Sequence, residues 1–188
     1  MTSPLLGVDR EDVLGFWFEE ASPSDWFQGG ESFDALVRER LEAPYELAQI
    51  GKLSSWRETA DGCLALCILL DQVPRNIFRG DPRSYATDPQ ALAVTRHALE
   101  AGFDQDLESD DQRAFLYLPL EHSEDLKDQA LSVKLFTSRT DSEVYQDYAR
   151  RHQAVIEKFG RFPHRNEVLG RTPTEAEARW LASRDTPF

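Results

Sequence analysis

The segment FGRFPHRNEVLGR, residues 159–171, concentrates positive charge in a chain whose net charge is −13. Its cationic side chains are Arg161, His164, Arg165 and Arg171. The planar guanidinium group of arginine binds carboxylates and phosphates through paired hydrogen bonds, so this island of charge predicts an anion-binding site. A structural interpretation is equally open, because cations just beyond the C-terminus of a helix stabilise the helix dipole.

A second polar motif, LDQVPRNIFRG at residues 70–80, follows the most apolar stretch of the chain. Its candidate anion-binding residues are Arg75, Asn76 and Arg79. Buried polar groups need partners, so the alternative is that the two arginines cap helix carbonyls or pair with acids such as Asp71. The motif therefore predicts either a binding site or a locked helix end.

A third motif, LYLPLEHSED at residues 116–125, places Glu121 and His122 beside a proline. A carboxylate and an imidazole can exchange protons near neutral pH, so these residues and His164 are candidate acid–base catalysts. Adjacent residues of a helix point to different sides, however, and Glu121 and His122 are not an obvious pair. His152 lies on an apolar stripe and is expected to be a core histidine.

The other acids and thiols do not predict a metal site. Cys63 and Cys67 lie four residues apart, but a structural zinc site needs four ligands and the chain has no further cysteine. The acidic run at residues 104–111 lacks the glycine and the final glutamate of an EF-hand loop. We expect buried core thiols, a solvated loop, no metal and no cofactor.

Composition predicts one globular domain spanning residues 1–188, because 40% of the residues are hydrophobic and 29% are charged. The acidic balance, with a pI near 4.7, disfavours nucleic acids and anionic membranes as partners. No apolar run approaches the roughly 20 residues that span a bilayer, and the N-terminus lacks the pattern of a secretory signal. A cytoplasmic location is therefore expected, and the oligomeric state is left open.

Helix start and stop signals recur along the chain, whereas strand-like alternation is nearly absent, so the fold class is predicted to be all-α. Seven or eight antiparallel helices are expected. They begin near residues 9, 31, 55, 88, 109, 124, 142 and 172, with a turn at residues 22–30. Pro74 is expected to end the third helix, Pro119 to bend or break the fifth, and Gly160 to end the seventh.

Three motifs quoted above, with VLGFWF at residues 13–18, SVKLF at residues 132–136 and the continuation RTPTEAE, resemble the bacterial domain-of-unknown-function 924 family. The resemblance covers almost the whole chain in the expected order. It implies a helical fold similar to tetratricopeptide-repeat proteins and no assigned activity or catalytic residues. Val73 and Leu118 depart from the family pattern, and both are exchanges of one core side chain for another.

Three hypotheses for function follow from the motifs. The first is a binding scaffold whose arginines and histidines line a groove for an anionic small molecule or a peptide carboxylate. The second is a hydrolytic enzyme that uses Glu121 and His122 or His164 as acid and base, with a metal held by Asp71 and His152 as one version. In the third, the polar motifs only lock helix ends together. Whether the protein is an enzyme is left open.

Overall fold

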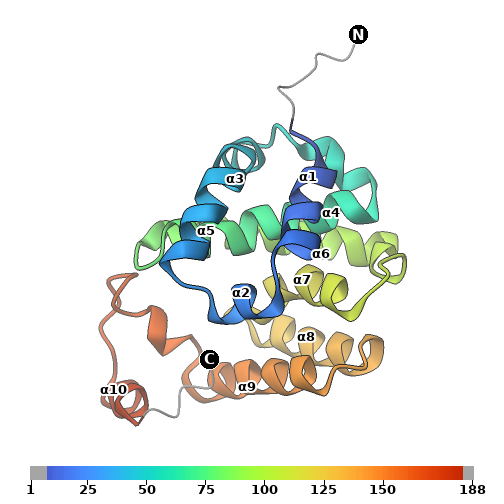
Figure 1. The fold of residues 1–188 in the computed structure, drawn as a ribbon. Helices are drawn as coiled ribbons and strands as arrows, with labels where there is room; N and C mark the ends of the chain where they lie inside the picture. The colour runs from blue at the N-terminus through green and yellow to red at the C-terminus, as the bar shows by residue number, and fades with distance from the viewer. Residues whose placement is uncertain (1–7, 184–188) are drawn as a thin grey trace. The chain divides into compact units, whose positions relative to one another are not determined.

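The structure is a computed structural model that describes residues 8–183. Within this range every regular element is a helix or a helical turn, as Figure 1 shows. The predicted all-α fold class is therefore confirmed. The comparison with tetratricopeptide-repeat proteins stays a prediction.

Contacts divide the described chain into two compact units. Unit 1 falls within Met1–Arg79 and Arg83–Leu107, and unit 2 falls within Gly80–Pro82 and Glu108–Phe188. The single domain over residues 1–188 stays a prediction.

Unit 1 contains six α-helices. They are α1 (Arg10–Gly15), α2 (Pro23–Gln28), α3 (Glu31–Gln49), α4 (Ala60–Cys67), α5 (Val73–Ile77) and α6 (Asp88–Ala101). Helix α4 packs against α1 and α6, and α3 packs against α5. Helix α4 is apolar almost all round, and every residue from Gly62 to Cys67 is buried, so it forms the centre of this unit.

The helix that contains α4 does not end at Pro74, contrary to the prediction. It passes through one π-helical turn, Ile68–Gln72, and continues as α5, where Pro74 occupies the first turn. Proline has no backbone N–H, and it is tolerated in a first turn because the N–H groups there have no partner within the helix. Because a new α-helix begins directly after the π turn, Pro74 lies in a first turn and the helical path continues past it.

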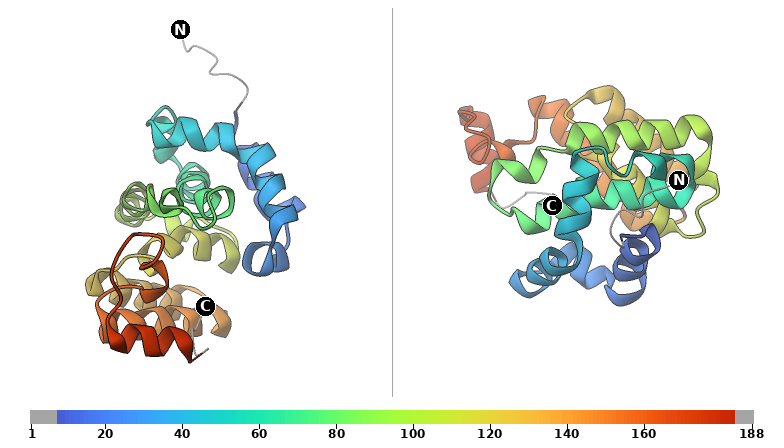
Figure 2. Two further views of the ribbon diagram at one scale, coloured as in Figure 1. Left: turned by 90° about the vertical axis from the view of Figure 1, so that its left-hand side faces the viewer. Right: turned by 90° about the horizontal axis from the view of Figure 1, so that it is seen from above.

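Unit 2 contains four α-helices, of which the first three form two successive antiparallel hairpins. They are α7 (Asp110–Glu121), α8 (Leu126–Arg139), α9 (Glu143–Phe159) and α10 (Glu175–Ala182). Helix α8 packs against both α7 and α9. The turned views of Figure 2 likewise show helices joined by short connections within this unit. The largest fully buried side chains here are Phe115, Leu116, Tyr117, Leu120, Phe136, Ile156 and Phe162.

Local capping signals place most helix boundaries correctly. Ser109 and Gln112 form the expected capping box of α7, and Gly160 ends α9 in a left-handed conformation with φ of 70°. Helix α7 runs through Pro119 unbroken. The structure corrects other details: the expected turn at residues 22–30 contains α2, and the caps of α4 and α10 are Thr59 and Thr174.

Candidate functional site

The polar residues of unit 2 are brought together by the segment between α9 and α10, residues 160–174, which we call the connector segment. It leaves α9 at Gly160 and makes one short helical turn at Pro163–Arg165. Phe162 is completely buried and packs with Val155 and Ile156 of α9. Burying this ring fixes the start of the segment and thereby positions the basic residues that follow it.

A cluster of ionisable side chains surrounds Phe162. It consists of Glu121, His122, His152, His164 and Arg165, which we call the histidine cluster. Three of the four histidines of the chain belong to it. The ring centroids of His122 and His152 lie 6.1 Å apart, and those of His152 and His164 lie 5.6 Å from that of Phe162. The structure thus unites the predicted acid–base candidates with Arg165.

His152 joins the middle of α9 to the C-terminal end of α7. Its Nδ1 lies 2.9 Å from the carbonyl oxygen of Tyr148 and 3.1 Å from Oε1 of Glu121. Both of these oxygens are acceptors, so Nδ1 carries the proton and Nε2 of the neutral ring is an acceptor. No local sequence signal predicts this contact, through which Glu121 orients the ring of His152.

The pKa of His152 is lowered to about 3, chiefly by burial, with electrostatic contributions from His122, His164 and Arg165 in the same direction. The carbonyl of Tyr148 acts in the opposite direction and is outweighed. His152 is therefore neutral at pH 7. Burial is the largest cause of this shift, because it disfavours the charged form of the imidazole.

Arg165 is buried, with 6% of its surface exposed, and it contacts two members of the site. Its guanidinium carbon lies 4.6 Å from the ring centroid of Phe162, within the range of a cation–π contact. Its Nη2 donates to the carbonyl oxygen of His122 over 3.0 Å. Arg165 thus connects the connector segment to the C-terminus of α7, where a cation is favoured.

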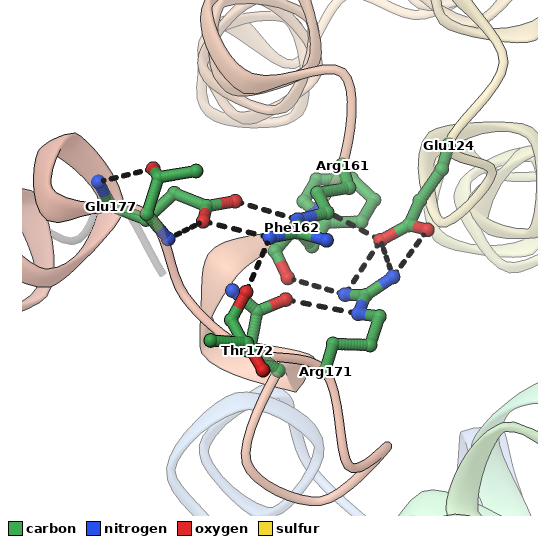
Figure 3. Close-up of polar contacts among 8 residues, drawn as sticks. Glu124, Arg161, Phe162, Arg171, Thr172 and Glu177 are labelled. Atoms are coloured by element: carbon green, nitrogen blue, oxygen red, sulfur yellow. Dashed lines mark hydrogen bonds and ion pairs between the residues drawn. The ribbon is translucent and has the colours of Figure 1, made fainter.

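Two arginines of the connector segment hold carboxylates, as Figure 3 shows. Arg161 donates through Nε and Nη2 to the two oxygens of Glu177 over 2.6 and 2.8 Å. Arg171 donates through Nη1 to Oε2 of Glu124 over 2.8 Å and through Nη2 to Oε1 over 3.1 Å. We call these contacts the Arg161–Glu177 pair and the Arg171–Glu124 pair, and both are bidentate.

These pairs shift the pKa values of both carboxyl groups. Arg161 is the main cause that lowers the pKa of Glu177 to about 2, and the backbone and side chain of Thr174 add to the effect. Burial alone would raise the pKa of Glu124, but hydrogen bonds from Arg171 and from the N–H of Phe162 outweigh it, and the net pKa is lowered. Both glutamates are therefore ionised at neutral pH.

The predicted anion-binding residues Arg75, Asn76 and Arg79 lie in unit 1, where each donates to other parts of that unit. Arg75 donates to both carboxylate oxygens of Asp88, over 2.8 and 3.0 Å. Arg79 forms a similar pair with Asp34, over 2.7 and 2.8 Å. These contacts match the structural alternative stated for the motif, and the role of the three residues in ligand binding stays a prediction.

The same motif also supplies caps for carbonyl groups around the π turn. Pro74 has no N–H to donate to the carbonyl of Leu70, and the hydroxyl of Thr87 donates to that oxygen over 2.5 Å. Nη1 of Arg75 donates to the carbonyl of Asp71 over 2.5 Å, and Asn76 donates to that of Gln72 over 3.0 Å. The polar residues of this motif thus satisfy the backbone where the regular helix is interrupted.

The acids, histidines and thiols do not gather into a metal-binding group in the described part of the chain. Within residues 8–183 no group of three or more histidine, cysteine, aspartate or glutamate side chains is arranged to hold a metal ion. Asp71 and His152, named together in one version of the enzyme hypothesis, belong to different units. Burial raises the pKa of Cys63 to about 11 and raises that of Cys67 as well, so both are thiols rather than thiolates.

Sequence reasoning missed the two glutamates that hold the connector segment. Glu124 lies in the third quoted motif, two residues after His122, and Glu177 is the partner of Thr174 in the capping box of α10. The capping pattern was the available signal for Glu177. Nothing local identifies Glu124, because its partner Arg171 lies 47 residues away in the sequence.

No helix among residues 8–183 is long and apolar enough to cross a membrane. No curated protein matches this chain. A solved structure, that of a protein of unknown function from Agrobacterium tumefaciens, is 38% identical to it, with a TM-score of 0.87. The match covers 93% of this chain and 97% of that one. The model of the family described as "Bacterial protein of unknown function (DUF924)" matches residues 13–185, and the chain therefore belongs to the DUF924 family.

Proposed function

We propose that unit 2 binds an anionic small molecule or a peptide carboxylate at the histidine cluster, through His122, His164 and Arg165. The observation that carries the proposal is the gathering of these side chains in one cluster: the ring centroid of His122 lies 6.1 Å from that of His152, and the ring centroid of His164 and the guanidinium carbon of Arg165 lie 5.6 and 4.6 Å from the ring centroid of Phe162. The permanent positive charge of Arg165 in this cluster attracts an anion.

The proposed ligand site is narrower than the groove expected from the sequence. A ligand at Arg75, Arg79 or Arg161 would have to compete with a carboxylate that already has bidentate geometry. Arg165 donates to the carbonyl oxygen of His122 and lies against the ring of Phe162, and its planar cation has the geometry that binds a carboxylate or phosphate. His164 is exposed and lies at the rim of the cluster.

Calorimetric titration tests the proposal with inorganic phosphate, citrate and a short peptide that carries either a free or an amidated C-terminus. We expect binding of at least one anion, and we expect His164→Gln to weaken it about tenfold, which equals about 1.4 kcal/mol. His97→Gln is the matched control, because His97 is the fourth histidine, is exposed and lies in unit 1.

Arg165→Gln should weaken the same ligand more strongly than His164→Gln, because it removes the permanent charge. Binding that is equally strong in His164→Gln, Arg165→Gln and the control would refute the proposed site. If none of the probes binds, the polar contacts of unit 2 are structural only.

An acid–base enzyme is the second candidate, and the orientation of His152 favours it. A carboxyl oxygen that accepts a hydrogen bond from Nδ1–H, and so leaves Nε2 as an acceptor, is the arrangement of a general base. His122 and His164 would then supply protons or bind the substrate. Hydrolysis of p-nitrophenyl acetate or phosphate that His152→Gln abolishes and His97→Gln preserves would support this function.

The cytoplasmic location expected from the sequence is a further part of the proposal.

A further inference from the structure

We propose that the connector segment is a removable cover that controls access to Glu121 and His152, latched by Glu124. The inference rests on the proposed function, because it concerns how a ligand reaches that site. Glu121 and His152 are only 3% and 7% exposed. A ligand that touches either side chain therefore needs part of the surrounding structure to move.

The connector segment supplies the side chains that cover this pair. Phe162 is fully buried with its ring centroid 5.6 Å from that of His152. Arg165 stacks against the ring of Phe162 and donates to the carbonyl of His122. Displacing this one segment would remove both groups from the neighbourhood of His152 without unpacking α7 from α8.

Glycines near both ends of the covering part provide joints for such a movement. Gly160 and Gly170 have φ values of 70° and 64°, in the left-handed region that favours glycine. A Cβ atom added at either position would meet nothing within 4 Å. Glycine is therefore needed at these positions for backbone conformation and not for close packing, so no neighbouring atom restricts a change of backbone angle there.

Glu124 holds both ends of the covering part at once, as Figure 3 shows. Its Oε1 accepts from the N–H of Phe162 over 2.7 Å, and its carboxylate pairs with Arg171. Nη2 of Arg171 in turn donates to the carbonyl of Phe162 over 2.9 Å. The side chains of Glu124 and Arg171 are 30% and 22% exposed, so solvent reaches the latch.

The Arg161–Glu177 pair is a second attachment of the segment. It joins the connector segment to α10, the helix that follows it, and Arg161 also donates to the carbonyl of Thr172 within the segment. Helix α10 itself packs against α9, because the ring centroids of Trp180 and Phe159 lie 5.4 Å apart. Release of Glu124 therefore frees the segment from the turn between α7 and α8, and full opening also breaks the Arg161–Glu177 pair, the Arg165–His122 contact and the packing of Phe162.

Chemical modification of histidine tests the cover without any ligand. Diethyl pyrocarbonate transfers an ethoxycarbonyl group to accessible imidazole nitrogens, and peptide mass analysis gives a rate for each histidine. In the full-length protein at pH 7 we expect His97 and His164, which are exposed, to react fast and His152 to react slowly. Glu124→Gln should raise the rate at His152 about tenfold and leave that at His97 unchanged.

Glu175→Gln is the matched control, because it removes a glutamate of unit 2 from an exposed ion pair with Arg179 and does not touch the segment. Amide hydrogen exchange measured in parallel should become faster in residues 161–171 of Glu124→Gln and remain slow in α9. Arg171→Lys keeps the positive charge but loses the bidentate geometry of the guanidinium group, so it should raise the rate of modification at His152 by a smaller factor. It replaces Glu124→Gln in the experiment if that variant does not fold.

An unchanged rate at His152 in Glu124→Gln and Arg171→Lys would overturn the cover. Equally fast exchange throughout α9 would also overturn it, because access would then come from unfolding of the unit. These readouts are separate from the proposed function. If Glu124→Gln exposes His152 while phosphate, citrate and the peptides still fail to bind, the proposed cover is supported and the proposed anion site is refuted.

Discussion

Arg171 and Glu124 form a bidentate ion pair across 47 residues of sequence, with N–O distances of 2.8 and 3.1 Å. The pair joins the connector segment to the turn between α7 and α8. The remaining nitrogen of Arg171 is also used, since Nε donates to Oδ1 of Asn166 over 2.9 Å. A single side chain thus organises the segment that carries Phe162, His164 and Arg165.

Removal of this side chain should destabilise the protein. Arg171→Ala leaves the partly buried Glu124 without its main partner, so we expect the free energy of unfolding to fall by about 2 kcal/mol. Arg151→Ala is the control, because Arg151 forms an ion pair with Asp147 in which both side chains are about half exposed. Such surface pairs contribute less than about 1 kcal/mol. Urea denaturation measures both, and equal losses would contradict the assigned role of Arg171.

The two glutamates should make stability fall at acid pH. The pKa of each is lower in the folded state than the ordinary value of 4.5, so the folded form binds fewer protons than the unfolded form as pH falls. The stabilisation is complete above about pH 5 and is lost between about pH 4.5 and pH 2. Urea midpoints measured across this range should decline less in Glu177→Gln than in the native protein. An identical decline would argue against the Arg161–Glu177 pair as its source.

His152 should add a pH dependence in a higher range. Its pKa is lowered from 6.5 to about 3 in the folded state, so the unfolded chain takes up a proton first as pH falls. Stability should drop by about 2 kcal/mol between about pH 6.5 and pH 5, with further loss toward pH 3. Nuclear magnetic resonance titration of the imidazole measures the pKa directly. His152→Gln should flatten the stability profile in this range, and a ring that titrates near 6.5 would contradict the prediction.

The hydroxyl of Thr87 should contribute to stability through the carbonyl of Leu70. Pro74 has no N–H to donate to that carbonyl, and Thr87→Val also removes the hydroxyl donor. We expect the free energy of unfolding to fall by about 1–2 kcal/mol. Thr140→Val is the matched control. In that variant the carbonyl of Phe136 loses the hydrogen bond from the hydroxyl of residue 140 but keeps the one from the backbone N–H of the same residue. Thermal unfolding of the two variants compares the losses. A larger loss in Thr140→Val would contradict the explanation given for the interrupted helix.

Much of the helical organisation is predictable because its signals are local. The capping box of Ser109 and Gln112 and the helix end at Gly160 involve residues at most a few positions apart, whose geometry depends little on the rest of the chain. The prediction failed at Pro74 because the chain avoids the missing hydrogen bond with a π turn and a distant hydroxyl donor. Helix α2 was missed because it is only six residues long.

The amino-acid sequence by itself determined the all-α class, most helix boundaries and the location of the polar motifs, since these depend on periodicity and on short-range hydrogen bonds. Only the tertiary structure decided which charges meet. It pairs Arg171 with Glu124 and Glu121 with His152, and it assigns the arginines of the second motif to Asp34 and Asp88. Partners of this kind are selected by the packing of distant helices, and neither the type of a charged residue nor its spacing identifies them.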